Sequence, residues 1–325
     1  MNIGIRSTLT GLVLLALSLG VHAQDYPTRP VTIIVPFAPG GGTDVLARML
    51  GQKLEERLGK TFVIENKGGA GTVIGANAVA RAAPDGYTLL MATSTPMAIN
   101  VTLYKNLPYD PATDLVPLAA VAQSPFVLVV NPALPVHSVR ELIALAKAKP
   151  GELSFGSAGP GSPHHLFAEL LKSMAGIEMT HVPYKGSLPA LNDVVAGHVP
   201  LMFIDYGSAD ALMQTGKVRP LAVSTKARIP AVPDVPPVAE AGVPGFDVAA
   251  WFMVAATGRT PRPIVQKLHD ELTAILALPE VRDRIVKISM LPMAGQPVDE
   301  LQGFVKSEIA RWGEVVRQAG VAGTE

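Results

Sequence analysis

The sequence contains no cysteine among its 325 residues, and this absence excludes several kinds of chemistry. Disulfide frameworks, thiolate catalysis, cysteine-bound metals and lipid-anchored cysteines all need the residue that is missing. Stability must therefore come from the burial of apolar surface. A chain of this length with 48% hydrophobic residues can bury large cores, and the length favours two domains.

Aromatic residues are also scarce, at 5% of the chain, and 27 basic residues are balanced by 27 acidic ones without any basic cluster. Nucleic-acid binding requires a basic surface and usually stacking aromatics, so we exclude nucleic acid as a partner. The histidines show no HExxH spacing, and the adjacent His164 and His165 are weak support for a metal. We expect neither a metal nor a cofactor.

The first 23 residues have the pattern of an export signal. Arg6 is the only charge before the apolar run "GLVLLALSLG", and Val21 and Ala23 offer small residues to a signal peptidase. The run is shorter than the roughly 20 residues that a membrane-spanning helix needs, and no later segment is long and apolar enough. We expect cleavage after about Ala23 and a soluble mature chain in the periplasm. Loss of Arg6 leaves it a net charge near −1.

Strand-like and helix-like runs alternate along nearly the whole mature chain. The runs "VTIIVP", "TFVIEN", "YTLLMAT", "FVLVV", "LSFGSAG", "MTHVPY" and "VPLMFID" each precede a helical pattern. Such repetition is typical of parallel-rich sheets flanked by helices, so we predict an α/β fold. After a proline-rich stretch at 228–247, the strand "VAAWFMVAAT" precedes two helices, at about 261–286 and 298–319.

Two breaks in this pattern predict two domains. One lies near "VAQSPFVLVV" and the other in the proline-rich stretch. We predict that residues 24–124 and 247–325 form domain 1 and that residues 125–246 form domain 2. Two chain crossings would make a hinge and leave a cleft between the domains. Ligands of parallel sheets bind beyond the carboxyl ends of the strands, so the loops after the strands are the candidate site.

The loop "PFAPGGGTD" places three glycines between the first strand and the first helix. Such backbone can aim several N–H groups at an anion, and the helix N-terminus adds about half a positive charge. A nucleotide does not fit, because the P-loop lysine is missing and Asp44 would repel a polyphosphate. The loop "GSAGPGSPHH" repeats the arrangement in the other domain. The two loops facing across a cleft would suit a small carboxylate. The alternative is that Thr43 or Asp44 only caps a helix.

A periplasmic serine hydrolase is a second alternative. No serine lies in a Gly-x-Ser-x-Gly motif, so Ser157 or Ser162 would have to lie within reach of His164 or His165. The simpler interpretation makes Ser162 a helix N-cap and leaves one of the histidines on the helix surface.

The segments "YPTRPVTIIVPFAPGGGTDVLAR", "VIENKGGAGTVIGANAVARAAPDGYTLL", "SFGSAGPGSPHHLFAELL" and "HVPYKGSLPALNDVVAGHVPLMF" resemble the solute receptors of tripartite tricarboxylate transporters, the Bug receptors. With three further segments, they cover nearly the whole mature chain in family order. The resemblance implies a two-lobed, Venus-flytrap periplasmic binding protein, type II-like, without catalytic residues. It implies delivery of a small carboxylate ligand to two integral membrane transporter subunits. Signalling to a sensor kinase is the alternative use, and we expect a monomer.

The resemblance also implies which residues border the ligand. They are Phe37, Ala38, Pro39, Gly40, Gly41, Thr43 and Asp44 in the first loop, Ser94 and Thr95 after the strand "YTLLMAT", and Ser157, Ala158, Gly159, Ser162 and His165 around the second loop. Asp205 could accept a hydrogen bond from the ligand or cap a helix. Met97 stands where many relatives carry histidine, from which we hypothesise a less polar distal pocket. Lys185 matches a family segment, but a solvated charge at a strand end explains it as well as a contact with the ligand carboxylate does.

Overall fold

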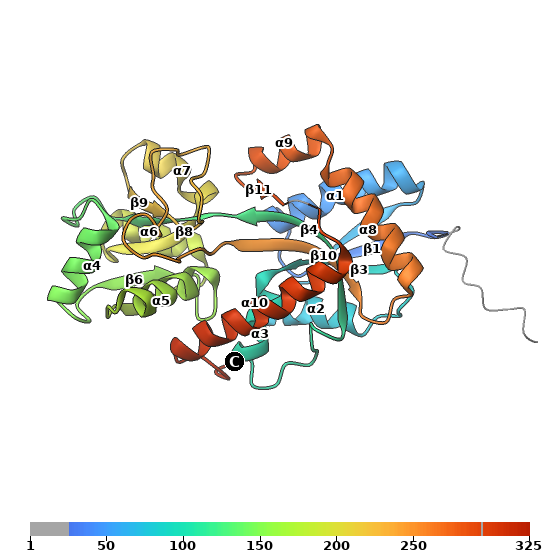
Figure 1. Ribbon diagram of the computed structural model, residues 1–325, viewed down its shortest axis with the longest axis horizontal. Helices are drawn as coiled ribbons and strands as arrows, with labels where there is room; N and C mark the ends of the chain where they lie inside the picture. Colours follow the sequence, from blue (N-terminus) through green and yellow to red (C-terminus); the bar gives the residue numbers. More distant parts are fainter. Residues whose placement is uncertain (1–25, 294) are drawn as a thin grey trace, which may run out of the picture.

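A computed structural model describes residues 26–293 and 295–325, so the expected signal segment lies outside the described residues. The chain forms two mixed sheets, each flanked by helices, which lie side by side as two lobes (Figure 1). The predicted α/β fold class is confirmed. None of the helices in the described ranges is both long and apolar enough to cross a membrane.

The first lobe contains a six-stranded sheet in the order β11-β4-β10-β3-β1-β2. Its strands are β1 (Val31–Val35), β2 (Phe62–Asn66), β3 (Thr88–Thr93), β4 (Leu115–Ser124), β10 (Ala250–Thr257) and β11 (Leu291–Pro292). Its helices are α1 (Gly42–Leu58), η2 (Ala70–Thr72), α2 (Val73–Ala80), η3 (Thr95–Ile99), α3 (Asn100–Leu103), α8 (Arg262–Leu276) and α9 (Pro279–Lys287). Strand β1 pairs in parallel with β2 and β3, so the loops after β1 and β3 leave the same edge of the sheet.

The second lobe contains a five-stranded sheet in the order β7-β6-β8-β5-β9. Its strands are β5 (Phe126–Val130), β6 (Ser154–Ser157), β7 (Thr180–Pro183), β8 (Leu201–Asp205) and β9 (Arg219–Val223). Its helices are α4 (Val139–Ala148), α5 (Pro163–Ala175), α6 (Ser187–Ala196) and α7 (Tyr206–Gln214). Strands β6 and β8 run parallel, whereas β5 is antiparallel to β8, so the start of β5 meets the end of β8.

The chain crosses between the lobes along two strand ends. Strand β4 ends at Ser124 and β5 begins at Phe126, so only Pro125 separates the sheets there. The return passes into β10, which pairs antiparallel with β4 and β3. Strand β4 was not predicted, because its alanines and Pro117 are poor strand formers. Pro117 lies beside a register shift in the pairing with β10, a position that tolerates a missing N–H.

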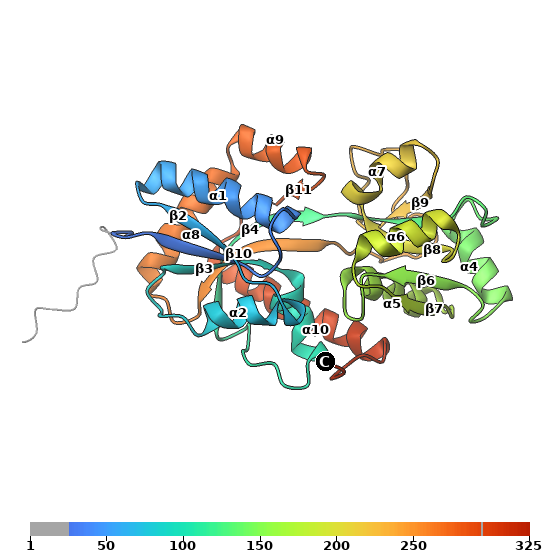
Figure 2. The same ribbon diagram turned by 180° about the vertical axis from the view of Figure 1, so that it is seen from behind.

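The C-terminal helix α10 (Val298–Gln318) lies against both lobes (Figures 1 and 2). Trp312 of α10 stacks on Phe167 of α5 with ring centroids 5.6 Å apart. Trp251 of β10 and Trp312 both donate to Glu308 Oε2, at 2.8 and 2.9 Å. One buried apolar cluster runs through both lobes beneath this helix. The two sheets are therefore separate, but the cores beside α10 are continuous. The predicted helix at 261–286 is in fact two helices, α8 and α9, since Pro279 starts a new one.

Candidate functional site

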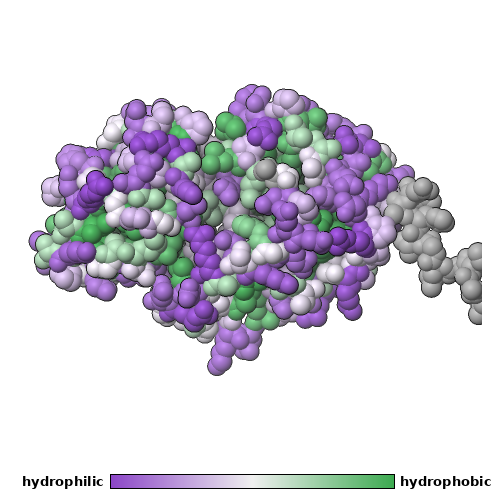
Figure 3. Space-filling model, viewed as in Figure 1, coloured by the Kyte–Doolittle hydropathy of each residue, from purple (hydrophilic) through white to green (hydrophobic). Residues whose placement is uncertain are grey.

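A cavity of about 730 Å³ lies between the lobes. The first lobe lines it with the loop after β1, the start of α1 and the end of β3, while the second lobe lines it with the starts of β5, α5 and α7. The hollow between the lobes is visible on the face shown in Figure 3. Among the predicted site residues, the cavity is lined by Phe37, Gly40, Gly41, Thr43, Ser94, Thr95 and Asp205. We call this cavity the cleft.

The start of helix α1 presents unpaired backbone donors to the cleft. Gly41 is the N-cap residue and makes no side-chain capping bond, and Gly41, Gly42 and Thr43 all line the cleft. The first N–H groups of a helix have no acceptor within the helix, and the helix dipole makes this end electropositive. The arrangement favours a carboxylate and needs no lysine or arginine.

Asp44 lies behind this loop and does not line the cleft. It is 3% exposed, and its carboxylate accepts hydrogen bonds from Arg48, from the Gly40 N–H at 3.0 Å and from Asn66 at 3.0 Å. The bond from Arg48 is the largest cause of a pKa lowered to about 2. The structure therefore gives Asp44 a role in shaping the glycine loop, where the sequence suggested contact with ligand.

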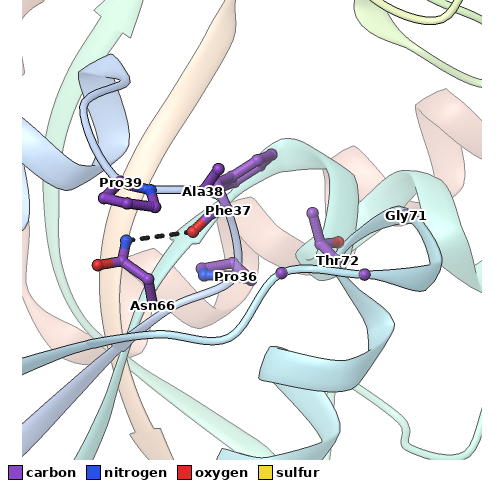
Figure 4. A pocket seen from close by; sticks show the side chains of 9 residues that line it. Pro36, Phe37, Ala38, Pro39, Asn66, Gly71 and Thr72 are labelled. Atoms are coloured by element: carbon purple, nitrogen blue, oxygen red, sulfur yellow. Dashed lines mark hydrogen bonds between the residues drawn. The ribbon is translucent and has the colours of Figure 1, made fainter.

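A neighbouring pocket of about 550 Å³ shares Phe37 with the cleft and is lined by the loop after β1 and by residues in and before η2 (Figure 4). Ala38 and Pro39 line this pocket together with Gly71 and Thr72, and they do not line the cleft. Asn66 Nδ2 donates to the carbonyl of Phe37 at 3.1 Å, which is the dashed contact in Figure 4. The segment that carries Ala38 and Pro39 is thus held to the end of β2.

The second glycine loop lines a third pocket, of about 450 Å³, which shares Phe37, Thr95, Pro163 and His164 with the cleft. Ala158, Gly159 and Ser162 line this pocket. The Ser162 hydroxyl donates to the Gly159 carbonyl at 2.7 Å and accepts from the His165 N–H at 3.4 Å. Unlike α1, helix α5 therefore begins with a capped N-terminus.

Ser157 and His165 lie inside the second lobe, at 0% and 1% exposure. Ser157 Oγ is 2.6 Å from His181 Nε2, and the His181 ring stacks on His165 with centroids 3.9 Å apart. Burial lowers the pKa of His181 to about 4. Of the two serines that the hydrolase alternative requires, Ser157 is buried and bonds to His181, and the Ser162 hydroxyl donates to the Gly159 carbonyl instead of to a histidine.

Thr93 and His164 are among the cleft residues that the sequence interpretation did not assign to the ligand. Thr93 Oγ1 and both ring nitrogens of His164 are buried without a hydrogen-bond partner among the described residues. Burial lowers the pKa of His164 to about 4, against an opposing effect of the Asp205 carboxylate. Thr93 ends a strand and His164 lies in the first turn of a helix. These positions, visible as patterns in the sequence, could have marked both residues as candidates for the site. Buried polar groups are nearly always satisfied in proteins, so these three atoms mark places for ligand or water.

Asp205 and Met97 complete the comparison with the sequence predictions. Asp205 lines the cleft and also caps α7, since its Oδ1 accepts from the Ser208 N–H at 3.0 Å. Met97 is 0% exposed within the apolar core and lines none of the three pockets. The hypothesis that Met97 makes the distal pocket less polar is therefore wrong, because this side chain does not reach the cleft.

These features define a two-lobed solute-binding protein with an uncapped helix N-terminus in its cleft. Residues 46–321 match the model of the tripartite tricarboxylate transporter family receptors. The chain belongs to this family, whose members are solute-binding proteins and not enzymes.

Solved structures of similar proteins agree with this assignment. The R. palustris protein Rpa4515, solved with adipate, is 42% identical, with a TM-score of 0.80 over 92% of this chain and 99% of its own. The periplasmic binding protein BugD is 36% identical, with a TM-score of 0.76 over 91% and 99%. MatC of Rhodopseudomonas palustris, solved with bound malate, is 35% identical, with a TM-score of 0.76 over 90% and 100%.

Proposed function

We propose that this protein is a periplasmic receptor that captures a small carboxylate between its lobes and presents the closed form to two integral membrane subunits of a tripartite transporter. The observation that carries the proposal is the uncapped start of α1 in the same cleft as the unpaired Thr93 and His164. Donors and unsatisfied polar atoms from both lobes converge on one cavity. A ligand there would bridge the lobes.

Relatives support the chemical class of the ligand. Rpa4515 was solved with adipate and MatC with malate, and both ligands are carboxylates. In our proposal the ligand carboxylate lies at Gly41–Thr43, where backbone N–H groups and the helix dipole replace its hydration.

We further propose that the lobes are domain 1 (24–124 and 247–325) and domain 2 (125–246), with the hinge at the two chain crossings. Ligand binding shifts the equilibrium toward the closed form by its differential affinity for that form. The membrane subunits then recognise surfaces that lie in register only when the lobes have closed. Export through cleavage after about Ala23 places the receptor on the correct side of the membrane.

The test is thermal unfolding of the mature protein, stripped of ligand by unfolding and refolding. The panel contains mono-, di- and tricarboxylates, with the neutral amide of each acid as its matched control. A ligand at 100 times its dissociation constant stabilises the folded state by about 2.7 kcal/mol. We expect a raised midpoint with one group of acids and none with their full amides. Equal shifts with acids and amides, or no shift with any acid, would refute carboxylate capture.

A further inference from the structure

The charges around the cleft are unusual for an anion-binding site. Among the described residues that line it there is no lysine or arginine, and the one acidic side chain is Asp205 of the second lobe. A first carboxylate is accommodated by the backbone of α1. A second carboxylate reaching the opposite wall would meet Asp205 without a cation to offset the repulsion, which is costly in a partly enclosed site.

On that opposite wall, His164 is the lining residue whose side-chain atoms are buried without a partner among the described residues. It occupies the first turn of α5 directly after Pro163, and its ring packs edge-on against Phe126 with centroids 5.0 Å apart. Phe126 lies opposite Asp205 in the pairing of β5 with β8. The ring is thus positioned by a rigid strand, beside Asp205, at the junction of the cleft and the third pocket.

Both nitrogens of this ring lack a partner among the described residues. A neutral imidazole presents one N–H donor and one acceptor nitrogen. The pKa lowered by burial keeps His164 in this neutral form at pH 7. The two nitrogens point to different sides of the ring, so a single ligand group bonds to one of them, as an acceptor for the N–H or as a donor to the bare nitrogen, according to the tautomer. A group that both donates and accepts fits either tautomer, whereas a carboxylate fits only the first case and an ammonium only the second.

We propose that the cleft selects a monocarboxylate whose far end carries an uncharged group that both donates and accepts hydrogen bonds, a carboxamide or a hydroxyl, and that His164 binds this group. The inference rests on the proposed function and names its ligand class. Apolar side chains of both lobes also line the cleft, and they fit an aliphatic or aromatic spacer between the polar ends. They are Phe37, Phe126, Phe252, Ile288 and Met290.

The experiment is isothermal titration at pH 7 of the refolded mature protein with matched acids. The six-carbon set is the half-amide of adipic acid, 6-hydroxyhexanoate, hexanoate, adipate and 6-aminohexanoate, with four- and eight-carbon sets to cover length. Within the set whose chain length binds best, we expect the half-amide or the hydroxy acid to bind at least about tenfold more tightly than the plain acid, the dicarboxylate and the amino acid. This is the range expected when a buried polar group is left unpaired by the weaker ligand.

Variants then assign the selectivity to one side chain. His164→Leu should remove the preference for the polar far end, so that the half-amide and the hydroxy acid bind no more tightly than the plain monocarboxylate. His164→Gln, which keeps a donor and an acceptor, should retain most of the preference. His137→Leu, at an exposed histidine remote from the cleft, is the matched control and should behave as wild type.

The outcomes separate this inference from the proposed function. Tightest binding by the dicarboxylate, or an unchanged preference in His164→Leu, would overturn it. Tightest binding by 6-aminohexanoate would also overturn it, because the ligand's ammonium group would then bind Asp205 on the opposite wall. Binding of acids without any discrimination at the far end would leave carboxylate capture intact and refute only the selectivity. Failure of every acid to bind would refute the proposed function itself.

Discussion

The two strand–glycine–helix loops look alike in sequence and differ in structure. The loop after β1 ends in a helix whose N-cap, Gly41, has no side chain to offer, so the backbone donors of α1 remain open to the cleft. The loop after β6 ends at Ser162, whose hydroxyl occupies the equivalent position on α5. Helix α5 therefore contributes a side chain to the cleft, that of His164. In our proposal, one lobe binds the ligand through its backbone and the other through an imidazole.

The largest expected effect comes from capping the open helix. Gly41 has φ −78 and open space where a Cβ would stand, so Gly41→Asp fits without strain. The new carboxylate accepts from the first turn of α1 and repels an incoming anion. We expect the affinity for the best acid to fall by about 100-fold or more, measured by titration calorimetry, without a loss of stability in the empty protein.

Gly41→Ala is the control for that change, because it adds bulk without charge or capping ability. It should weaken binding far less than the aspartate. Equal affinity in Gly41→Asp and wild type would show that the ligand does not use this helix terminus.

The next largest effect should come from removing the Asp44 carboxylate, which holds the glycine loop by hydrogen bonds. Asp44→Ala removes the buried acceptor of the Gly40 N–H, Asn66 and Arg48. We expect the free energy of unfolding to fall by about 2 kcal/mol, since groups that lose a charged acceptor are left unsatisfied. Urea unfolding measures this loss. Arg48→Ala should cost less, because the Arg48 side chain is 54% exposed and an exposed ion pair contributes little.

The pH dependence of this loss identifies the carboxylate as its source. The pKa of Asp44 is lowered from 3.8 to about 2 in the folded protein, chiefly by the bond from Arg48. The stability that the ionised Asp44 carboxylate contributes to the folded protein is therefore present above pH 4 and is lost as the pH falls toward 2. The difference in stability between wild type and Asp44→Ala should narrow over that range. A constant difference would assign the loss to packing.

The smallest effect should come from uncapping the second helix. Ser162→Ala removes the cap of α5 and should lower stability by about 1 kcal/mol while leaving ligand affinity within about twofold. Ser138→Ala, which uncaps α4 far from the cleft, is the matched control with a similar loss. A tenfold loss of affinity in Ser162→Ala alone would mean that the second loop also binds ligand directly.

The sequence allowed the alternation of strands and helices to be predicted because each run carries its own hydrophobic period. It did not allow β4 to be predicted, because that strand is stabilised by pairing with β10 and not by local propensity. Adjacent helical residues point about 100° apart, so the choice between His164 and His165 depends on how α5 sits on its sheet. Sequence alone does not determine that rotation.

The roles of Asp44 and Ser157 were missed for a related reason. Both residue types are expected near an anion site, and both lie within a few residues of a loop that lines one of the pockets. Their polar atoms are already satisfied by Arg48 and Asn66 in one case and by His181 in the other. Only the three-dimensional hydrogen-bond network distinguishes a residue that shapes a loop from a residue with an unsatisfied atom facing a cavity.

The packing of α10 across the lobes also supplies an optical reporter. The chain has two tryptophans, and both donate to the same Glu308 carboxylate where β10, α10 and the second lobe meet. All tryptophan emission therefore arises from this junction. Any movement of Phe167 relative to Trp312 during closure would change the polarity and quenching around one indole. The unlabelled protein thus carries a fluorescence probe of the proposed lobe movement, usable with ligands too weak for calorimetry.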